Sequence, residues 1–254
     1  MDRSEPLTCR VALEFSRQID LHASLAPLGR WGDDLLDRWD GTNLVRSVRL
    51  GPDGTQVAWC AEVNGSAPRS IELSYPSDAG VEGVALLGAV GATFVLDAGL
   101  DELIAVDQQI ADLAGRYPGV VPVLVPDPFA ALVRSISAQQ VNLRWATVIR
   151  ARLAERYGRR LSVGPWHVHA LDAHALASAR VEDLRELQLT NAKARAVVAT
   201  ARAEQAGELR RDELERLDDE ALVAHLTRLP GVARVQSSFA LRTVRKSAEL
   251  PVRT

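Results

Sequence analysis

Apolar residues alternate with polar or small residues near the start of the chain, which is the pattern of a half-buried β-strand. The odd-numbered residues from Val11 to Phe15 follow this two-residue period. Three later segments are rich in β-branched and apolar residues: residues 43–50, 55–63 and 69–75. Residues 51–54 (GPDG) and 64–65 (NG) separate these segments and favour turns. The pattern predicts a small antiparallel sheet, in which residues 22–39 form a helix or an irregular connection.

After about residue 97 the apolar spacing changes to that of an amphipathic helix. Residues 120–128 hold three prolines and predict a stiff linker. Asp127 and Pro128 then fit the N-cap and the first position of a helix. Helical patterns follow at residues 129–136, 141–157, 176–187, 191–205 and 218–229. We therefore expect an α+β fold, with an N-terminal antiparallel sheet domain followed by an all-α domain.

The composition is that of a globular protein with no general positive field. The 254 residues carry a formal net charge of −3 and are 47% hydrophobic, so a nucleic-acid role would have to rest on a local basic face. The two cysteines, Cys9 and Cys60, are too few for a disulfide framework or a four-cysteine metal site. No signal-peptide pattern opens the chain, and the apolar run at residues 84–96 is too short to span a bilayer. We expect a soluble, cytoplasmic protein with no membrane contact.

Several blocks in the second half of the chain match one known family in order and spacing. The first block comprises residues 127–141 (DPFAALVRSISAQQV), 145–146 (WA) and 152–158 (RLAERYG). A later block, residues 187–194 (LQLTNAKA), resembles the family segment Gly-Leu-Ser-x-x-Lys-Ala, with Gln188 where glycine is usual. The chain thereby resembles the DNA-3-methyladenine glycosylase II family of the helix-hairpin-helix DNA glycosylase superfamily. With this resemblance the expected domains are 1–96 (sheet), 97–235 (helix-hairpin-helix glycosylase type) and 236–254 (a divergent basic tail).

The resemblance implies a DNA repair enzyme of the base-excision pathway. Such an enzyme flips an alkylated base, for example 3-methyladenine, out of double-stranded DNA and hydrolyses its N-glycosidic bond. The resemblance also implies a monomer with no cofactor and no metal, associated with the nucleoid. In the family, the side chain that fills the gap in the base stack follows the first signature helix, which maps to Gln140 with Gln139 beside it. The alternative interpretation is that the two glutamines only cap a helix end.

Residues 229–235 (LPGVARV) resemble the hairpin motif with which this superfamily grips one DNA strand through backbone N–H groups. Leu229, Gly231 and Val232 fit the first half of the motif, where glycine lets the backbone approach a phosphate closely. Ala233 stands where the second glycine is usual. The resemblance therefore implies DNA contacts at Leu229, Gly231 and Val232 through an imperfect hairpin.

Basic residues continue beyond the motif, and Arg234 and Arg242 are candidate phosphate contacts. Val235 stands where lyase relatives carry a nucleophilic lysine. The resemblance therefore implies monofunctional hydrolysis without a Schiff base.

The aspartate that the family places after the hairpin has no counterpart, because no aspartate follows Asp219. That carboxylate would stabilise the positive charge that develops on the sugar, so we assign no catalytic residue and expect little hydrolysis but weak, salt-sensitive DNA binding. Residues 229–251 also weakly resemble the end of the ligand-binding domain in Lrp/AsnC-type regulators. Either the gene lost its end by frameshift or fusion, or this similarity is chance and the tail is a divergent hairpin helix. The alternative functions are a catalytically dead DNA-binding remnant and a regulator-like fusion that binds a small effector.

Two further groups of polar residues are candidate sites. His167 and His169 have the spacing of metal ligands on a strand, but Pro165 and the helical surroundings argue against a strand, so we expect exposed or capping histidines. Asp33 and Asp34 are expected to lie in a solvated turn rather than to act as a general acid and base.

Overall fold

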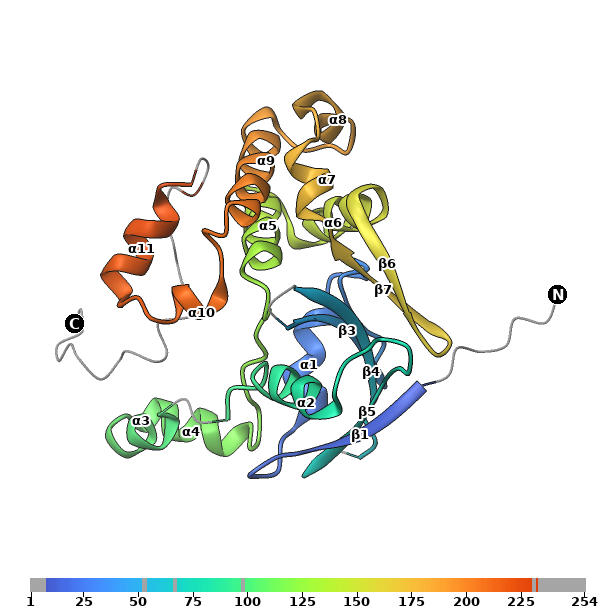
Figure 1. Cartoon of the computed structure of the whole chain (residues 1–254). Coiled ribbons are helices and arrows are strands. Elements are labelled where there is room, and N and C mark those ends of the chain that lie inside the picture. Colours follow the sequence, from blue (N-terminus) through green and yellow to red (C-terminus); the bar gives the residue numbers. More distant parts are fainter. Residues whose placement is uncertain (1–7, 52–53, 66–67, 97–98, 230–231, 233–254) are drawn as a thin grey trace.

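The computed structural model describes residues 8–51, 54–65, 68–96, 99–229 and 232. The N-terminal part forms a five-stranded antiparallel sheet in the order β1-β5-β4-β3-β2 (Figure 1). The strands are β1 (Thr8–Glu14), β2 (Asp37–Trp39), β3 (Asn43–Leu50), β4 (Thr55–Glu62) and β5 (Ser70–Pro76). The expected sheet is therefore present, and the connection at residues 22–39 contains helix α1 (Leu21–Gly29) and strand β2.

Strands β3 and β4 are buried on both faces of the sheet. Successive side chains of a strand point to opposite sides, so each strand contributes to two packing contacts. Val48 and Trp59 belong to the hydrophobic cluster that includes α1 and α2 (Gly83–Gly91). Val45 and Cys60 point to the other side and pack against a two-stranded hairpin. This hairpin, β6 (Gly158–Val163) and β7 (Trp166–Leu171), lies far from the sheet in sequence.

The expected α+β fold is confirmed, and the β6–β7 hairpin adds two strands to its helical second half. The expectation of no strand at the two histidines was wrong. Helix α6 (Leu143–Tyr157) gives way directly to β6 at Gly158, where a Cβ atom would come within 2.4 Å of the Ala154 carbonyl oxygen. Pro165 does not interrupt a strand, because it lies with Gly164 in the two-residue turn of the hairpin. His167 and His169 are therefore strand residues on β7.

The remaining helices of the second half pack around one hydrophobic cluster centred on Phe129, Ile149 and Leu153. They are α5 (Pro128–Ala138), α7 (Ala173–Ala177), α8 (Val181–Glu186), α9 (Asn191–Gln205) and α11 (Asp219–Thr227). The short helix α10 (Arg211–Leu214) buries no residue. Asp127 caps α5 as expected, since its carboxylate accepts a hydrogen bond from Ala130 N at 3.1 Å. The sequence pattern predicts burial of six residues, of which Val148 is half-buried and the other five are buried: Val133, Ile136, Leu153, Val197 and Val198.

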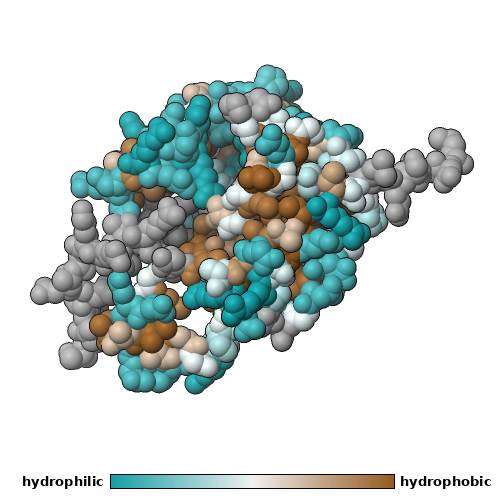
Figure 2. Space-filling view, turned by 60° about the horizontal axis from the view of Figure 1, so that its bottom comes forward, coloured by the Kyte–Doolittle hydropathy of each residue, from teal (hydrophilic) through white to brown (hydrophobic). Residues whose placement is uncertain are grey.

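Helices α3 (Leu100–Val106) and α4 (Gln108–Arg116) lie away from this cluster, at the lower left of Figure 1, and bury none of their residues. Figure 2 shows hydrophobic residues gathered over them, and Val106 is 82% exposed. Val121 lies in the segment expected to be a linker, and it is buried in the hydrophobic cluster of the sheet. Apart from Leu36, the buried residues of the helical core all come from Phe129 onward, and none comes from the described residues 99–128. No helix in the described part of the chain is long and apolar enough to cross a membrane.

Candidate nucleic-acid interface

The two glutamines singled out in the sequence lie on the tight loop between α5 and α6. Gln139 ends α5 with an extended backbone, and Gln140 adopts a left-handed backbone with φ of 54°. Both residues are exposed. Asn142 then starts α6, since its side-chain oxygen accepts a hydrogen bond from Trp145 N at 2.8 Å. The loop therefore presents Gln140 to solvent from a backbone conformation that ordinary residues rarely adopt.

The exposed loop begins two residues after a buried anchor, Ser137. The Lys193 ammonium group donates a hydrogen bond to the Ser137 carbonyl oxygen at 3.0 Å. Arg150 approaches the Ser137 hydroxyl from α6, with an Nη1–Oγ distance of 3.4 Å. Lys193 is itself buried, and this burial lowers the pKa of its amine. Residues from α6 and α9 thus meet at the last turn of α5.

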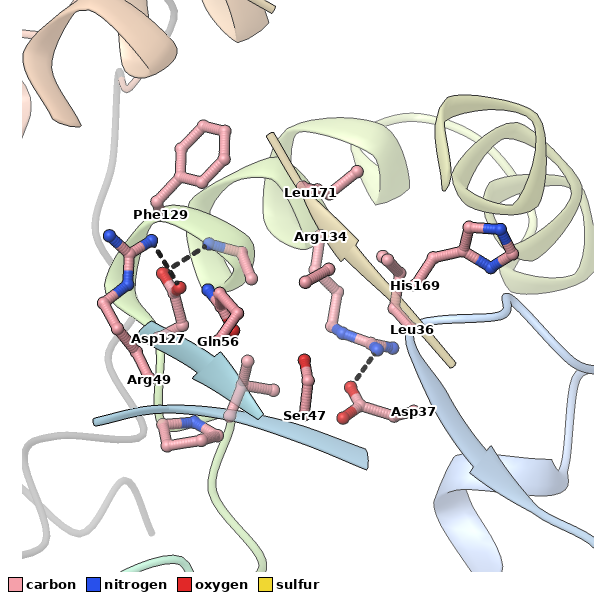
Figure 3. Close-up of a pocket in the computed structure, with 14 residues that line it drawn as sticks. Leu36, Asp37, Ser47, Arg49, Gln56, Asp127, Phe129, Arg134, His169 and Leu171 are labelled. Carbon is pink, nitrogen blue, oxygen red and sulfur yellow. Dashed lines mark hydrogen bonds and ion pairs between the residues drawn. The ribbon is translucent and has the colours of Figure 1, made fainter. Parts of the chain in front are cut away.

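The arginine at this anchor belongs to a buried ion network between the sheet and the helices. Asp34 accepts from Arg150 Nε at 2.8 Å and pairs with Arg134 Nη1 at 3.0 Å. Asp37 accepts from Arg46 Nε at 2.6 Å and from Arg134, which points toward it in Figure 3. Burial raises the pKa of Asp37, but the charges of Arg46 and Arg134 outweigh it and hold the pKa below its ordinary value. The network therefore joins β2 and β3 to α5 and α6.

The burial of Asp34 shows that the expectation of a solvated turn for the acidic pair was wrong. Asp33 is exposed, but Asp34 is only 3% exposed. Its Oδ1 accepts the backbone N–H groups of Leu36 and Asp37, both at 3.1 Å, and its Oδ2 meets the two arginines. No local signal distinguishes these adjacent aspartates, because the partners of Asp34 lie on distant helices.

Figure 3 shows a small pocket beside this network, between the sheet and α5. Arg49 lies at its rim and pairs with Asp127 at 3.1 Å and with Glu204 of α9 at 2.9 Å. The charge of Arg49 is therefore compensated by carboxylates of the protein itself. We therefore interpret the pocket as part of the contact between sheet and helices.

The two histidines of β7 lie side by side. Their ring centroids are 5.9 Å apart in an edge-to-face arrangement. Burial and the nearby charge of Arg160 lower the pKa of both rings. Among the described residues, no group of three or more His, Cys, Asp or Glu side chains is placed to hold a metal ion.

A second exposed feature, absent from the sequence analysis, lies beside the start of α6. The Arg30 guanidinium stacks over the Trp31 ring at 5.0 Å, and Trp31 is 41% exposed. The adjoining Gly32 lies against the Thr147 methyl group, which a Cβ at Gly32 would meet at 3.6 Å. Arg144, in the first turn of α6, is exposed as well. An Arg-Trp pair directly after a helix is the signal that could have identified this surface.

Of the residues predicted to contact DNA through the hairpin, the structure describes Leu229 and Val232. Leu229 and Val232 are 6% and 7% exposed and belong to the helical core, so their side chains face inward. Any DNA contact at these two positions would have to be made by the backbone. Gly231, Arg234 and Arg242 lie outside the described residues, as do the replaced positions of the motif and the expected tail at 236–254.

Comparison with known proteins points to one family. Residues 133–248 match the family model described as HhH-GPD superfamily base excision DNA repair protein. A DNA-3-methyladenine glycosylase of Bacillus subtilis (strain 168) is 22% identical over 153 residues, which is 59% of this chain and 50% of that protein. The chain thus spans about half the length of this curated relative.

Solved structures share the fold. A 3-methyladenine DNA-glycosylase from Archaeoglobus fulgidus superposes with a TM-score of 0.69 at 21% identity, covering 87% of this chain and 73% of the other. An 8-oxoguanine glycosylase/lyase of Clostridium acetobutylicum, in complex with double-stranded DNA containing cytosine opposite 8-oxoG, gives 0.59 at 15% identity, covering 87% and 74%.

Proposed function

We propose that this chain, whose residues 133–248 carry an HhH-GPD domain, is a base-excision DNA glycosylase that acts on alkylated bases such as 3-methyladenine. The observation that carries the proposal is the exposed loop between α5 and α6, with Gln140 held in a left-handed backbone. The names of the bacterial and archaeal relatives support the choice of an alkylated base.

The loop suits the insertion step of base flipping. A base inside the duplex is out of reach, so the enzyme extrudes it at a cost of a few kcal/mol. A side chain that enters the gap offsets part of this cost. Gln140 can do so because its side chain is exposed while the backbone on both sides is anchored at Ser137 and Asn142.

Electrostatics suit contact with phosphates near this loop, although the whole chain carries a net charge of −3. Arg30 and Arg144 are exposed beside the start of α6, and Trp31 offers an aromatic face. Phosphate contacts release counterions, so binding should weaken steeply as salt rises. Gly231, Arg234 and Arg242 remain proposed contacts of the hairpin.

The hydrolytic step is separable from binding. Among these 254 residues no aspartate follows Asp219, and Glu249 is the one acid after Glu220. Loss of a main electrostatic group typically costs about 10²–10³-fold in rate. For a polypeptide of these 254 residues we therefore expect slow release of 3-methyladenine together with DNA binding. Val235, where lyase relatives carry lysine, makes this release a hydrolysis rather than a lyase reaction.

Two assays test the proposal. The first measures the affinity for a duplex with an abasic-site analogue against the same duplex undamaged, at two salt concentrations. The second follows single-turnover release of 3-methyladenine. Preference for the abasic duplex, weaker binding at high salt and slow release are expected. Equal affinity for both duplexes with no release would contradict the proposal, and ligand-dependent dimerisation would favour the regulator alternative.

The role of Gln140 has its own test. Gln140→Ala should lower the preference for the abasic duplex about tenfold, or about 1.4 kcal/mol, because the gap in the stack is no longer filled. Gln108→Ala on α4 is the control, since Gln108 lies on a helix remote from the loop and should not affect binding. An unchanged preference in Gln140→Ala would leave only the helix-capping interpretation of the two glutamines.

A further inference from the structure

We propose that Arg150 is a positioning residue that clamps both ends of the α5–α6 loop and so sets the direction of the Gln140 side chain. This inference rests on the proposed function for its DNA readout, but the clamp itself is visible in the contacts of the protein alone.

On the side where α5 ends, Arg150 Nη1 lies 3.4 Å from the Ser137 hydroxyl oxygen. That hydroxyl donates to the Arg134 carbonyl oxygen at 2.7 Å, so it is fixed within the last turn of α5. Lys193 adds a bond to the Ser137 carbonyl oxygen at 3.0 Å. A cation at the carbonyl end of a helix is favourable, because the last carbonyls have no partner within the helix.

On the side where α6 begins, Arg150 Nη2 donates to the Thr147 hydroxyl oxygen at 3.1 Å. The Thr147 hydroxyl in turn donates a hydrogen bond to the Leu143 carbonyl oxygen at 3.0 Å. Leu143 is the first residue of α6. Arg150 itself belongs to α6, so its guanidinium group joins the start of α6 to the last turn of α5 on the two sides of residues 139–142.

The guanidinium is itself held in place from the sheet side. Its Nε donates to Asp34 Oδ2 at 2.8 Å, and Asp34 is fixed by two backbone N–H groups. Arg150 and Asp34 are 7% and 3% exposed, so neither charge can turn outward to water. The N-terminal sheet thus supplies the fixed point from which the loop is clamped.

The clamp matters because Gln140 has a strained backbone. A non-glycine residue in the left-handed region costs of order 1–3 kcal/mol and keeps that conformation only when its surroundings hold it. If Arg150 releases the two helix ends, Gln140 can relax to a common backbone conformation. Its side chain would then leave the direction in which it can enter the base stack.

A conservative pair of variants separates positioning from stability. Arg150→Lys keeps a buried positive charge near Asp34 but loses the fork that reaches both Ser137 and Thr147. Arg46→Lys is the matched control. Arg46 is 1% exposed, and its hydrogen bonds to the described residues go to Asp37 and to the Leu124 carbonyl oxygen rather than to the loop. Both variants should lower the melting temperature.

The first measurement needs no DNA. Hydrogen exchange of the backbone amides at residues 139–142 should be about tenfold faster in Arg150→Lys than in the wild type and unchanged in Arg46→Lys, at a temperature where all variants are folded. Equal exchange at this loop in Arg150→Lys and the wild type would overturn the clamp, whatever the protein does with DNA.

The second measurement is a double-mutant cycle on the preference for abasic over undamaged duplex. Arg150→Lys should reduce this preference about fivefold, and adding Gln140→Ala should reduce it little further, because both act through one side chain. Arg46→Lys should leave the preference unchanged. Independent effects of Arg150→Lys and Gln140→Ala would overturn the positioning role. A wild type without any preference would instead count against the proposed function, while the exchange result still decides on the clamp.

Discussion

Removing the Asp37 carboxylate should destabilise the contact between sheet and helices, and the structure sets the magnitude. Asp37→Ala leaves Arg46, which is 1% exposed, without its carboxylate partner. Among the described residues, Arg46 then keeps one hydrogen bond, from Nη2 to the Leu124 carbonyl oxygen at 3.0 Å. Arg134 suffers less, since it still pairs with Asp34. Breaking a buried ion pair on one side typically costs about 3–5 kcal/mol.

Urea unfolding, followed by circular dichroism, measures this cost directly. Thermal unfolding gives the same information as a melting temperature. For a chain of this size each kcal/mol lowers the melting temperature by about 2–4 °C, so the melting temperature of Asp37→Ala should fall by about 6–20 °C. Arg10→Ala is the control, because it breaks the Arg10–Glu72 pair, whose side chains are 66% and 59% exposed. An exposed pair of this kind contributes at most about 1 kcal/mol.

The pH dependence supplies a second check with a defined sign. The folded-state pKa of Asp37 lies below its ordinary value of 3.8. The unfolded carboxyl group therefore binds a proton first as pH falls, and the contribution of Asp37 is present above about pH 4 and lost as pH falls through the folded pKa. The difference in unfolding free energy between wild type and Asp37→Ala should be constant near neutral pH and shrink below pH 4. A difference below about 1 kcal/mol at neutral pH would refute this account of the buried network.

Two further substitutions test the packing, each against a matched control. Leu153→Ala should cost about 2–5 kcal/mol of unfolding free energy, because Leu153 is fully buried in the helical core, whereas Leu113→Ala on the exposed face of α4 should change it by about 0.5 kcal/mol or less. Gly119→Ala should destabilise by more than about 1 kcal/mol, since its φ is 78° and a Cβ would lie 2.9 Å from Asp20 N. Gly115→Ala, in open space on α4, should instead stabilise by about 0.5–1 kcal/mol. Urea midpoints measure all four, and an equal response within either pair would contradict the assigned packing.

The sequence by itself determined those features that depend on neighbours along the chain. Strand β3 was predicted with its observed bounds, Asn43–Leu50, because its β-branched and apolar residues and the turn signal after it are local properties. The start of α5 was predicted equally well, since Asp127 caps the helix and Pro128 fits its first turn. The family blocks placed Gln140 directly after a helix, where the structure has it.

The tertiary structure alone decided what depends on partners distant in sequence. The β6–β7 hairpin was missed because its burial comes from the outer face of a sheet formed about a hundred residues earlier. Periodicity could not show that α3 and α4 leave the helical core, because an amphipathic helix has the same pattern whether or not another surface covers it.

The clearest case is the acidic pair at Asp33 and Asp34. Both residues look alike in sequence, and an acidic pair next to a glycine normally lies in water. Asp34 is buried because Arg150, 116 residues away, and Arg134 bring positive charge to it. A buried carboxylate is tolerated only where such partners compensate its lost hydration, and that compensation is a property of the assembled fold.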